Sequence, residues 1–265
     1  MYEQEYGKAI EAARLAGDII ANYFGKSLTV HQKGNDQPVT KADQEANEII
    51  QKTLLSAFPD DAWLSEETKD NPDRLKKERV WIVDPLDGTK EFINNIPEFA
   101  VSIALVLRGK PVVGVIYNPI TDELYSARRG EGAFLNRHPI RTTSKKDLEK
   151  AHILASRSEV SKGEWHPYVG RCMIHPLGGM AYKMARVAAG SADGSFSLLP
   201  KSEWDICAGV LLIEEAKGEV SLPDGKPFHF NNTNFVFPGI VYGNSSIYKQ
   251  LLGLISSSKK SLNRF

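Results

Sequence analysis

Cysteine is scarce in this chain, and its scarcity excludes several kinds of protein. Only Cys172 and Cys207 occur in 265 residues, and they form no CxxC pair. Disulfide-stapled scaffolds and cysteine-ligated zinc modules need more cysteines at closer spacing. The six histidines show neither HxxxH nor HExxH spacing, so a zinc peptidase site is not indicated either. We interpret both cysteines as buried intracellular thiols.

Excess charge and long apolar runs are also missing. Lys plus Arg and Asp plus Glu number 33 each, so no overall field attracts nucleic acid or an anionic membrane. No run approaches the roughly 20 apolar residues that span a bilayer. The start of the chain, MYEQEYGKAI, carries acids where a secretory signal has a basic segment. The sequence predicts a cytoplasmic protein that binds neither nucleic acid nor membrane.

The first half of the chain predicts two helices followed by an antiparallel sheet. Apolar residues recur at spacings of three and four over residues 2–24, and again from Ala42 to the stop at Phe58-Pro59. Between the helices, Gly34 to Pro38 predict a loop. β-branched runs then flank a hairpin turn at 108–110, and we expect strands over 80–83, 99–107, 111–119 and 123–127.

The second half predicts alternating strands and helices. We expect strands over 151–156, 172–177, 219–222 and 238–244, and helices over 180–190, 205–218 and 245–255. The polar segment 141–150 is the predicted hinge. The expected organisation is an α+β half over residues 1–145 and an α/β half over residues 146–265.

Two like charges stand on a turn in the stretch WIVDPLDGTKEF. Asp84 ends a predicted strand and Asp87 follows across Pro85-Leu86, where proline forbids a helix and Gly88 lets the backbone double back. The two carboxylates can therefore converge. Buried like charges are costly unless a cation neutralises them. An exposed turn rich in Asp, Pro and Gly is the plainer explanation of this stretch on its own.

Further acids at element ends favour the cation. Glu66 ends the short apolar run AWL, whereas Asp43 and Asp205 stand at helix starts, where each alone is explained as a helix cap. Oxygen ligands without His or Cys indicate Mg²⁺, Mn²⁺ or Ca²⁺. Acids clustered around hard cations suit phosphoryl chemistry, and the Gly88-Thr89 turn offers backbone N–H groups to an anion.

Four motifs in order resemble the inositol monophosphatase superfamily of metal-dependent, lithium-sensitive phosphatases. They are VTKAD at 39–43, SEE at 65–67, DPLDGT at 84–89 and EWDICAGVLLIEEAKG at 203–218. The resemblance covers most of the chain. It implies a layered αβαβα sandwich of the sugar-phosphatase type, two or three Mg²⁺ ions per site with Mn²⁺ as a possible substitute, and a homodimer.

The resemblance also implies roles for matching positions. The metal ligands it implies are Glu66, Asp84, the Leu86 carbonyl, Asp87 and Asp205. Asp43, Glu66 and Thr89 are implied to position and deprotonate the attacking water, and Gly88 with Thr89 to hold the phosphate. Ser65 departs from the family pattern, because glycine usually stands there.

The resemblance leaves the substrate between two readings. Lys90-Glu91, Glu203 before Trp204, and Lys183 are similar to the 3′(2′),5′-bisphosphate nucleotidase branch, in which Lys183 and Glu203 would bind substrate. Residues 114–140 are instead similar to inositol phosphatases. We take hydrolysis of the 3′-phosphate of 3′(2′)-phosphoadenosine 5′-phosphate as the main hypothesis, with inositol-1-monophosphatase or fructose-1,6-bisphosphatase as the alternative. A small phosphorylated molecule is the expected partner.

Overall fold

The computed structural model describes residues 1–26, 30–33 and 37–262. The predicted loop at Gly34 to Asp36 lies outside these residues. Beside it, residues expected to be loop form two short strands, β1 (Val30–Lys33) and β2 (Gln37–Thr40), which pair antiparallel. In the described part of the chain, no helix is long and apolar enough to cross a membrane.

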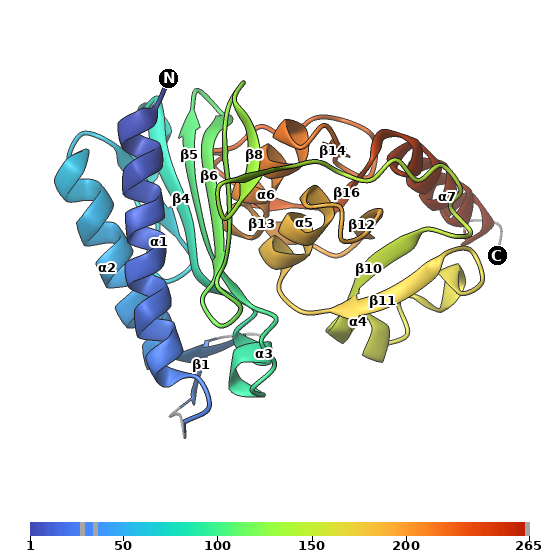
Figure 1. The fold of residues 1–265 in the computed structure, drawn as a ribbon, viewed down its shortest axis with the longest axis horizontal. Helices are drawn as coiled ribbons and strands as arrows, with labels where there is room; N and C mark the ends of the chain where they lie inside the picture. Colours follow the sequence, from blue (N-terminus) through green and yellow to red (C-terminus); the bar gives the residue numbers. More distant parts are fainter. Residues whose placement is uncertain (27–29, 34–36, 263–265) are drawn as a thin grey trace.

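Five layers of helix and sheet stack from one side of the molecule to the other (Figure 1). The first is a helix pair, α1 (Glu3–Tyr23) and α2 (Lys41–Ala57). A seven-stranded sheet follows, then α5 (Met180–Ala188) with α6 (Glu203–Glu215), then a five-stranded sheet, and finally α7 (Ser245–Leu262). The predicted αβαβα sandwich is therefore confirmed.

The seven-stranded sheet follows chain order. Its strands are β3 (Ala62–Ser65), β4 (Arg79–Asp87), β5 (Ala100–Leu107), β6 (Lys110–Asn118), β7 (Glu123–Arg128), β8 (Gly132–Leu135) and β9 (His138–Ile140). All neighbours pair antiparallel except β3 and β4, which run parallel. That parallel pair is a departure from the predicted antiparallel sheet.

The five-stranded sheet has the order β11 (Met173–Leu177), β10 (His152–Ser156), β12 (Gly194–Ser197), β16 (Ile240–Gly243) and β14 (Glu219–Ser221). Parallel and antiparallel pairs are mixed in it. The short elements that connect these layers are α3 (Thr89–Ile93), α4 (Arg157–Ser161), β13 (Lys201–Ser202), β15 (Val236–Phe237) and the 3₁₀ turns Pro72–Lys76 and His166–Tyr168.

Helix α6 is buried on all sides because it lies between the two sheets. Its run ICAGVLLI is apolar throughout, as a fully enclosed helix requires. It packs closely on β6, since a Cβ at Gly114 would stand 3.0 Å from the Ala208 carbonyl oxygen. Through α5 and α6 the second half contributes to the same core as the first-half sheet, and the division at 145 stays a prediction.

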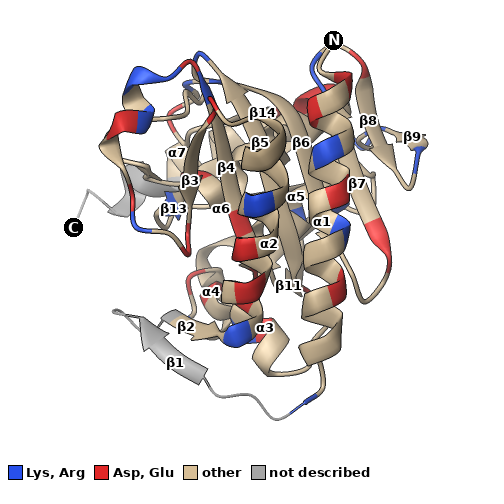
Figure 2. Cartoon of the chain, turned by 90° about the vertical axis from the view of Figure 1, so that its left-hand side faces the viewer, with Lys and Arg blue, Asp and Glu red and all other residues tan. Residues whose placement is uncertain are grey.

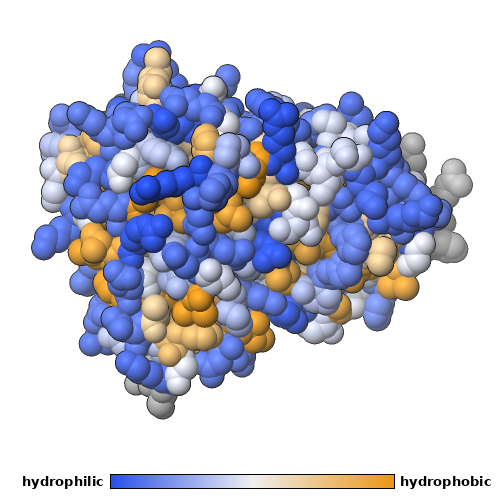
Figure 3. Space-filling view, in the orientation of Figure 1, coloured by the Kyte–Doolittle hydropathy of each residue, from blue (hydrophilic) through white to orange (hydrophobic). Residues whose placement is uncertain are grey.

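The surface agrees with the balanced composition. On the face drawn in Figure 2, both basic and acidic residues are spread along α1 and α2, without a basic stripe. Hydrophilic side chains cover most of the face seen in Figure 3, with hydrophobic ones in separate small groups. The face drawn in Figure 2 therefore carries no basic stripe of the kind that binds nucleic acid.

Candidate active site

The acid pair Asp84 and Asp87 lies on β4 itself, not on a turn after it. Asp84 pairs with Ser102 and Asp87 with Ala100, so three steps on β4 face two steps on β5. This β-bulge inserts one residue, which rotates the side chains that follow. Two positions three apart on a regular strand point to opposite faces, and the bulge is what brings both acids to one cavity wall.

Glu66 reaches the same wall through the parallel strand pair. Ser65 lies opposite Val83, and the Glu66 N–H donates to the Val83 carbonyl at 3.2 Å, so Glu66 stands next to Asp84 where the pairing of β3 with β4 ends. The unusual Ser65 is accommodated, because its hydroxyl donates to Asn47 Oδ1 at 2.7 Å and the residue is buried. Serine instead of glycine therefore leaves Glu66 at the cavity.

Asp205 comes from the second half of the chain. It lies in the first turn of α6, where its Oδ2 accepts the Ser202 N–H at 2.7 Å. The cavity has a volume of about 260 Å³, and its acidic lining residues near β4 are Glu66, Asp84, Asp87 and Asp205. The predicted ligand residues, with Leu86, are thus brought to one cavity from three separate parts of the chain.

Burial raises the pKa values of Asp84, Asp87 and Asp205, and repulsion by neighbouring acids adds to the rise at Asp84 and Asp205. Burial raises the pKa of Asp84 most, and the charges of Glu66, Asp87 and Asp205 raise it further. Burial and the charge of Asp87 raise the pKa of Asp205 to about 7. The four acids are therefore close enough to repel one another, and a cation among them relieves a real electrostatic cost.

All the donors at this wall are oxygens, which suits a hard divalent cation. In the described ranges, however, no three Asp, Glu, His or Cys side chains stand close enough to form a metal-holding group. The acids share a wall without closing on a point. To hold a cation, these side chains would have to move closer together.

Asp87 has a second function that the sequence did not reveal. Its carboxylate accepts the N–H groups of Met180 at 2.8 Å, Ala181 at 2.7 Å and Tyr182 at 3.3 Å, and so caps α5 across 93 residues of chain. These bonds offset part of the burial that raises its pKa. Asp87 thus ties the cavity wall on β4 to the helix layer behind it.

Asp43 and Thr89 form the second predicted group. Asp43 Oδ2 accepts from the Thr40 N–H at 2.8 Å and the Thr40 hydroxyl at 2.6 Å, while Oδ1 lies 3.1 Å from Thr89 Oγ1. Burial raises the pKa of Asp43 to about 6, although the bonds from Thr40 oppose the rise. A carboxylate with this pKa accepts a proton readily near neutral pH.

Gly88 needs to be glycine. Its φ is 96°, and a Cβ there would stand 3.0 Å from the Glu98 carbonyl oxygen and 3.1 Å from Phe99 Cβ. The sharp turn sets Thr89 at the start of α3, and both residues line the cavity.

Lys183 and Glu203, the two residues that favoured a nucleotide bisphosphate as substrate, lie in different places. Lys183 lines the cavity but is buried, and its Nζ donates to the carbonyls of Gly179 at 2.9 Å and Leu177 at 3.3 Å. Burial lowers its pKa, and the charge of Asp87 opposes this. Glu203 does not reach the cavity. As the first residue of α6 it points away from Asp205, and its fully buried carboxylate accepts the N–H groups of Asn231 and Asn232.

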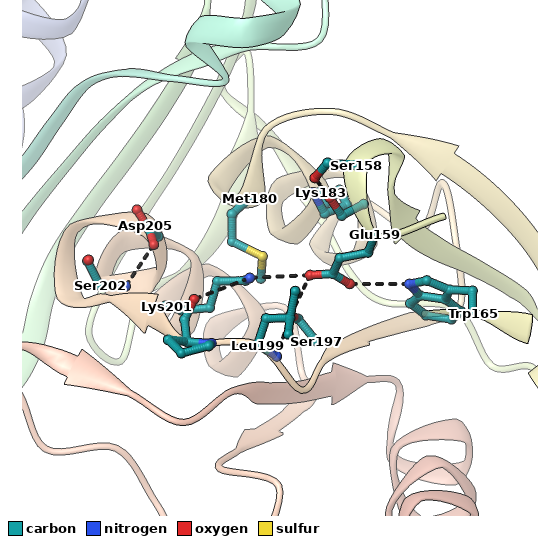
Figure 4. A network of polar contacts seen from close by, with 12 residues as sticks. Ser158, Glu159, Trp165, Met180, Lys183, Ser197, Leu199, Lys201, Ser202 and Asp205 are labelled. Carbon is teal, nitrogen blue, oxygen red and sulfur yellow. Dashed lines mark hydrogen bonds and ion pairs between the residues drawn. The ribbon is translucent and has the colours of Figure 1, made fainter. Parts of the chain in front are cut away.

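Sequence reasoning missed the opposite wall of the cavity. Glu159 on α4 accepts from Ser197, Trp165 and Lys201, and Glu159, Ser197 and Lys201 all line the cavity (Figure 4). The segments that carry them are short and were not predicted as elements. The cue available was the dense run of polar residues from Ser156 to Glu159, after a predicted strand.

Comparison with known proteins gives one consistent result. A model of the inositol monophosphatase family matches residues 1–260. An inositol-1-monophosphatase of Mesorhizobium japonicum is 39% identical and aligns over 92% of both chains, and inositol monophosphatase 3 of Solanum lycopersicum is 37% identical over 85% of this chain and 88% of its own.

A solved structure extends the likeness to the fold. The crystal structure of the extragenic suppressor protein suhB from Bartonella henselae superposes with a TM-score of 0.82, at 36% identity, over 94% of this chain and 97% of that one. These matches bear out the predicted superfamily and the predicted class of enzyme, and members of the family are generally Mg²⁺-dependent. The chain therefore belongs to the inositol monophosphatase family and is a phosphoric monoester hydrolase.

Proposed function

We propose that the chain is a Mg²⁺-dependent phosphomonoesterase that hydrolyses inositol monophosphate or a closely similar polyol phosphate. One observation carries the proposal: four acids that repel one another line a cavity beside the contact of 3.1 Å between Thr89 and Asp43. Direct hydrolysis of a phosphate ester requires a cation site and a base close to it. The four acids would provide the first and Asp43 the second.

The substrate in this proposal is the alternative of the two that the sequence left open. The relatives from Solanum lycopersicum and Mesorhizobium japonicum are both named as inositol monophosphatases. The lysine that favoured a nucleotide bisphosphate, Lys183, is buried, and its ammonium group already donates to the carbonyls of Leu177 and Gly179. Glu203, the other residue that favoured it, lies outside the cavity.

The proposed metal site consists of Glu66, Asp84, the Leu86 carbonyl, Asp87 and Asp205. When bound there, Mg²⁺ supplies Lewis acidity and neutralises charge that develops on the phosphate oxygens and the leaving alkoxide. The acids hold the cation and are relieved of their mutual repulsion by it. Mn²⁺ offers the same oxygen preference and is the expected substitute.

The protein's own residues supply the proton chemistry. Thr89 Oγ accepts a hydrogen bond from the attacking water while donating its own to Asp43 Oδ1. A proton lost from the water passes along this bond to Asp43, whose raised pKa fits it to hold that proton near pH 7. Backbone N–H groups at Gly88 and Thr89 orient the phosphate for attack.

A direct assay tests the proposal. Phosphate release from inositol 1-phosphate, adenosine 3′,5′-bisphosphate and fructose 1,6-bisphosphate is measured with Mg²⁺, and again with excess EDTA. We expect inositol 1-phosphate to give the highest kcat/KM and EDTA to abolish release. Release that persists undiminished in EDTA would falsify the metal assignment, and a higher kcat/KM for the nucleotide would restore the nucleotidase reading.

Three properties expected from the resemblance remain predictions: inhibition by Li⁺, a homodimer and a cytoplasmic location. Li⁺ titration of the same assay and sedimentation of the purified protein test the first two. Binding to nucleic acid or membrane is not expected, since the composition supplies no excess of basic residues.

A further inference from the structure

The active-site cavity has two walls of different chemistry. The wall near β4 carries carboxylates, which only accept hydrogen bonds or bind cations. The opposite wall carries the side chains of Ser156, Ser158, Glu159, Ser197 and Lys201, which include hydroxyl and ammonium donors. If the phosphate occupies the first wall, the rest of the substrate faces the second.

The second wall is held in place by a compact hydrogen-bond network (Figure 4). Glu159 Oε1 accepts from the Ser197 hydroxyl at 2.6 Å and from Lys201 Nζ at 3.3 Å, and Oε2 accepts from Trp165 Nε1 at 3.2 Å. The Glu159 side chain is only 6% exposed. Because its partners come from three separate segments, the carboxylate holds a fixed position.

The network holds Lys201 in place but does not use all of its hydrogen-bond donors. Its Nζ has two long contacts, 3.3 Å to Glu159 and 3.4 Å to the Pro200 carbonyl. An ammonium group has three donors, so one remains for a ligand. The Lys201 side chain is 15% exposed and lines the cavity.

The charge of Lys201 is paired on this side of the cavity, and the pairing decides what fits beside it. Apart from the four acids near β4, the charged lining residues are Lys90, Lys183, Lys201, Glu91 and Glu159. Lys201 forms an ion pair with Glu159 at 3.3 Å, and the charges of Asp87 and Glu159 both act on Lys183. A second phosphate beside Lys201 would also meet the Glu159 carboxylate, whereas a hydroxyl accepts from one partner and donates to another without net charge.

We propose that the Glu159–Lys201 pair is the specificity-determining element that binds hydroxyl groups of a neutral polyol leaving group. The inference rests on the proposed function and deepens it, because it says which part of the molecule distinguishes a polyol phosphate from other phosphate esters. Lys201 donates to a substrate hydroxyl oxygen, and Glu159 holds Lys201 in place. Neither residue takes part in the proton transfer assigned to Asp43 and Thr89.

A matched pair of substrates tests this proposal. Inositol 1-phosphate and cyclohexyl phosphate share a six-membered ring and a secondary alkoxide leaving group, but only the first has hydroxyls. The readout is the ratio of their kcat/KM values in Mg²⁺, together with inositol 1,4-bisphosphate as an anionic arm. Losing a hydrogen bond from a charged donor to a hydroxyl costs roughly tenfold or more in such a ratio.

We expect Lys201→Met to lower the ratio at least tenfold and Lys201→Arg to recover part of it. Glu159→Gln, which removes the charge that orients Lys201, should lower the ratio less. The control is Lys162→Met, which removes an exposed lysine on the same half and should leave the ratio unchanged. Circular dichroism and thermal melting check that each variant is folded.

The other outcomes overturn the inference. An unchanged ratio in Lys201→Met shows that the pair does not read hydroxyls, and an equal fall for both esters shows that Lys201 serves the reacting phosphate. Preference for the bisphosphate that Lys201→Met abolishes means that the wall reads an anion. If no ester is hydrolysed, the proposed function fails, and the ratio of dissociation constants from calorimetry still tests the inference.

Discussion

Two helices of this protein begin with the same short motif, but the Asp residue of each motif has a different chemical environment. At α2 the motif is Thr40 to Asp43, and at α6 it is Ser202 to Asp205. In both, the fourth residue is an Asp whose Oδ2 accepts the backbone N–H of the first, at 2.8 Å and 2.7 Å respectively. Each Asp thus serves as the reciprocal half of a capping box.

The difference lies in the remaining oxygen of each carboxylate. Oδ1 of Asp43 lies 3.1 Å from the Thr89 hydroxyl, a neutral donor. Asp205 instead lies in a cavity wall with three other acids, and the charge of Asp87 is the second cause of its raised pKa. The same local motif therefore yields a poised proton acceptor in one place and a proposed cation ligand in the other.

Replacing each Asp by Asn is expected to give the largest difference between the two capping boxes. The Asn side-chain oxygen still accepts the capping N–H, so both helices keep their caps, while the charge is lost. We expect Asp205→Asn to reduce kcat by roughly a thousandfold and raise the Mg²⁺ concentration for half-maximal rate at least tenfold. Asp43→Asn should reduce kcat by about 10²–10³ without moving that concentration.

Steady-state rates over a Mg²⁺ titration provide the measurement, with circular dichroism as a check on folding. If both variants shift the Mg²⁺ requirement equally, the two acids share one role, and the distinction drawn from their second oxygens is wrong.

The pH dependence of stability gives a smaller but independent contrast. An acid whose pKa is higher in the folded than in the unfolded protein binds more protons when folded, so stability falls as pH rises between the two values. For Asp205 the fall runs from about pH 4 to about 7, and for Asp43 from about pH 4 to about 6. Each pH unit of separation is worth about 1.4 kcal/mol at most.

Urea denaturation of metal-free protein from pH 4 to 8 measures this fall. We expect Asp205→Asn to reduce the loss of unfolding free energy between about pH 4 and about pH 7. Asp43→Asn should reduce that loss only between about pH 4 and about pH 6. Mg²⁺ at pH 8 should restore stability to the wild type, because it binds only the folded acid cluster. A wild-type protein that grows steadily more stable from pH 4 to 7 without metal contradicts the repulsion inferred here.

The two capping boxes also show which features of the structure could be predicted from the sequence. Caps depend on neighbours three residues apart, so both Asp residues were predicted at helix starts, and the hairpin of β5 and β6 followed from β-branched runs around a turn. Contacts between distant segments left no local pattern. The capping of α5 by Asp87 and the bond between Glu159 and Lys201 join segments 93 and 42 residues apart.

Errors in the prediction have the same origin. Glu203 was predicted to bind substrate because it comes directly before Trp204. On a helix, however, side chains two positions apart point in different directions, so that Asp205 lines the cavity and Glu203 does not. Strand β12, with the sequence GSFS, was missed because its polar residues resemble a loop and its burial depends on neighbours on both sides.

The smallest expected effect concerns the first residue of each box. The buried Thr40 hydroxyl donates to Asp43 Oδ2 at 2.6 Å and accepts the Ala42 N–H at 3.2 Å, whereas Asp205 Oδ2 accepts the backbone N–H of Ser202, which Ser202→Ala retains. Thr40→Ala should therefore cost about 1–2 kcal/mol of unfolding free energy, and Ser202→Ala about 0.5–1 kcal/mol.

The rate profile distinguishes the two alanine variants more sharply than stability does. The Thr40 hydroxyl lowers the pKa of Asp43 by hydrogen bonding, so removing it raises that pKa and moves the acid limb of the kcat profile to higher pH. Ser202→Ala leaves the limb in place, and Thr40→Ser, which keeps the hydroxyl, should behave as wild type. A Thr40→Ala enzyme that is less stable but has an unmoved acid limb means that a group other than Asp43 accepts the proton, since only the carboxylate bonded to that hydroxyl feels its removal.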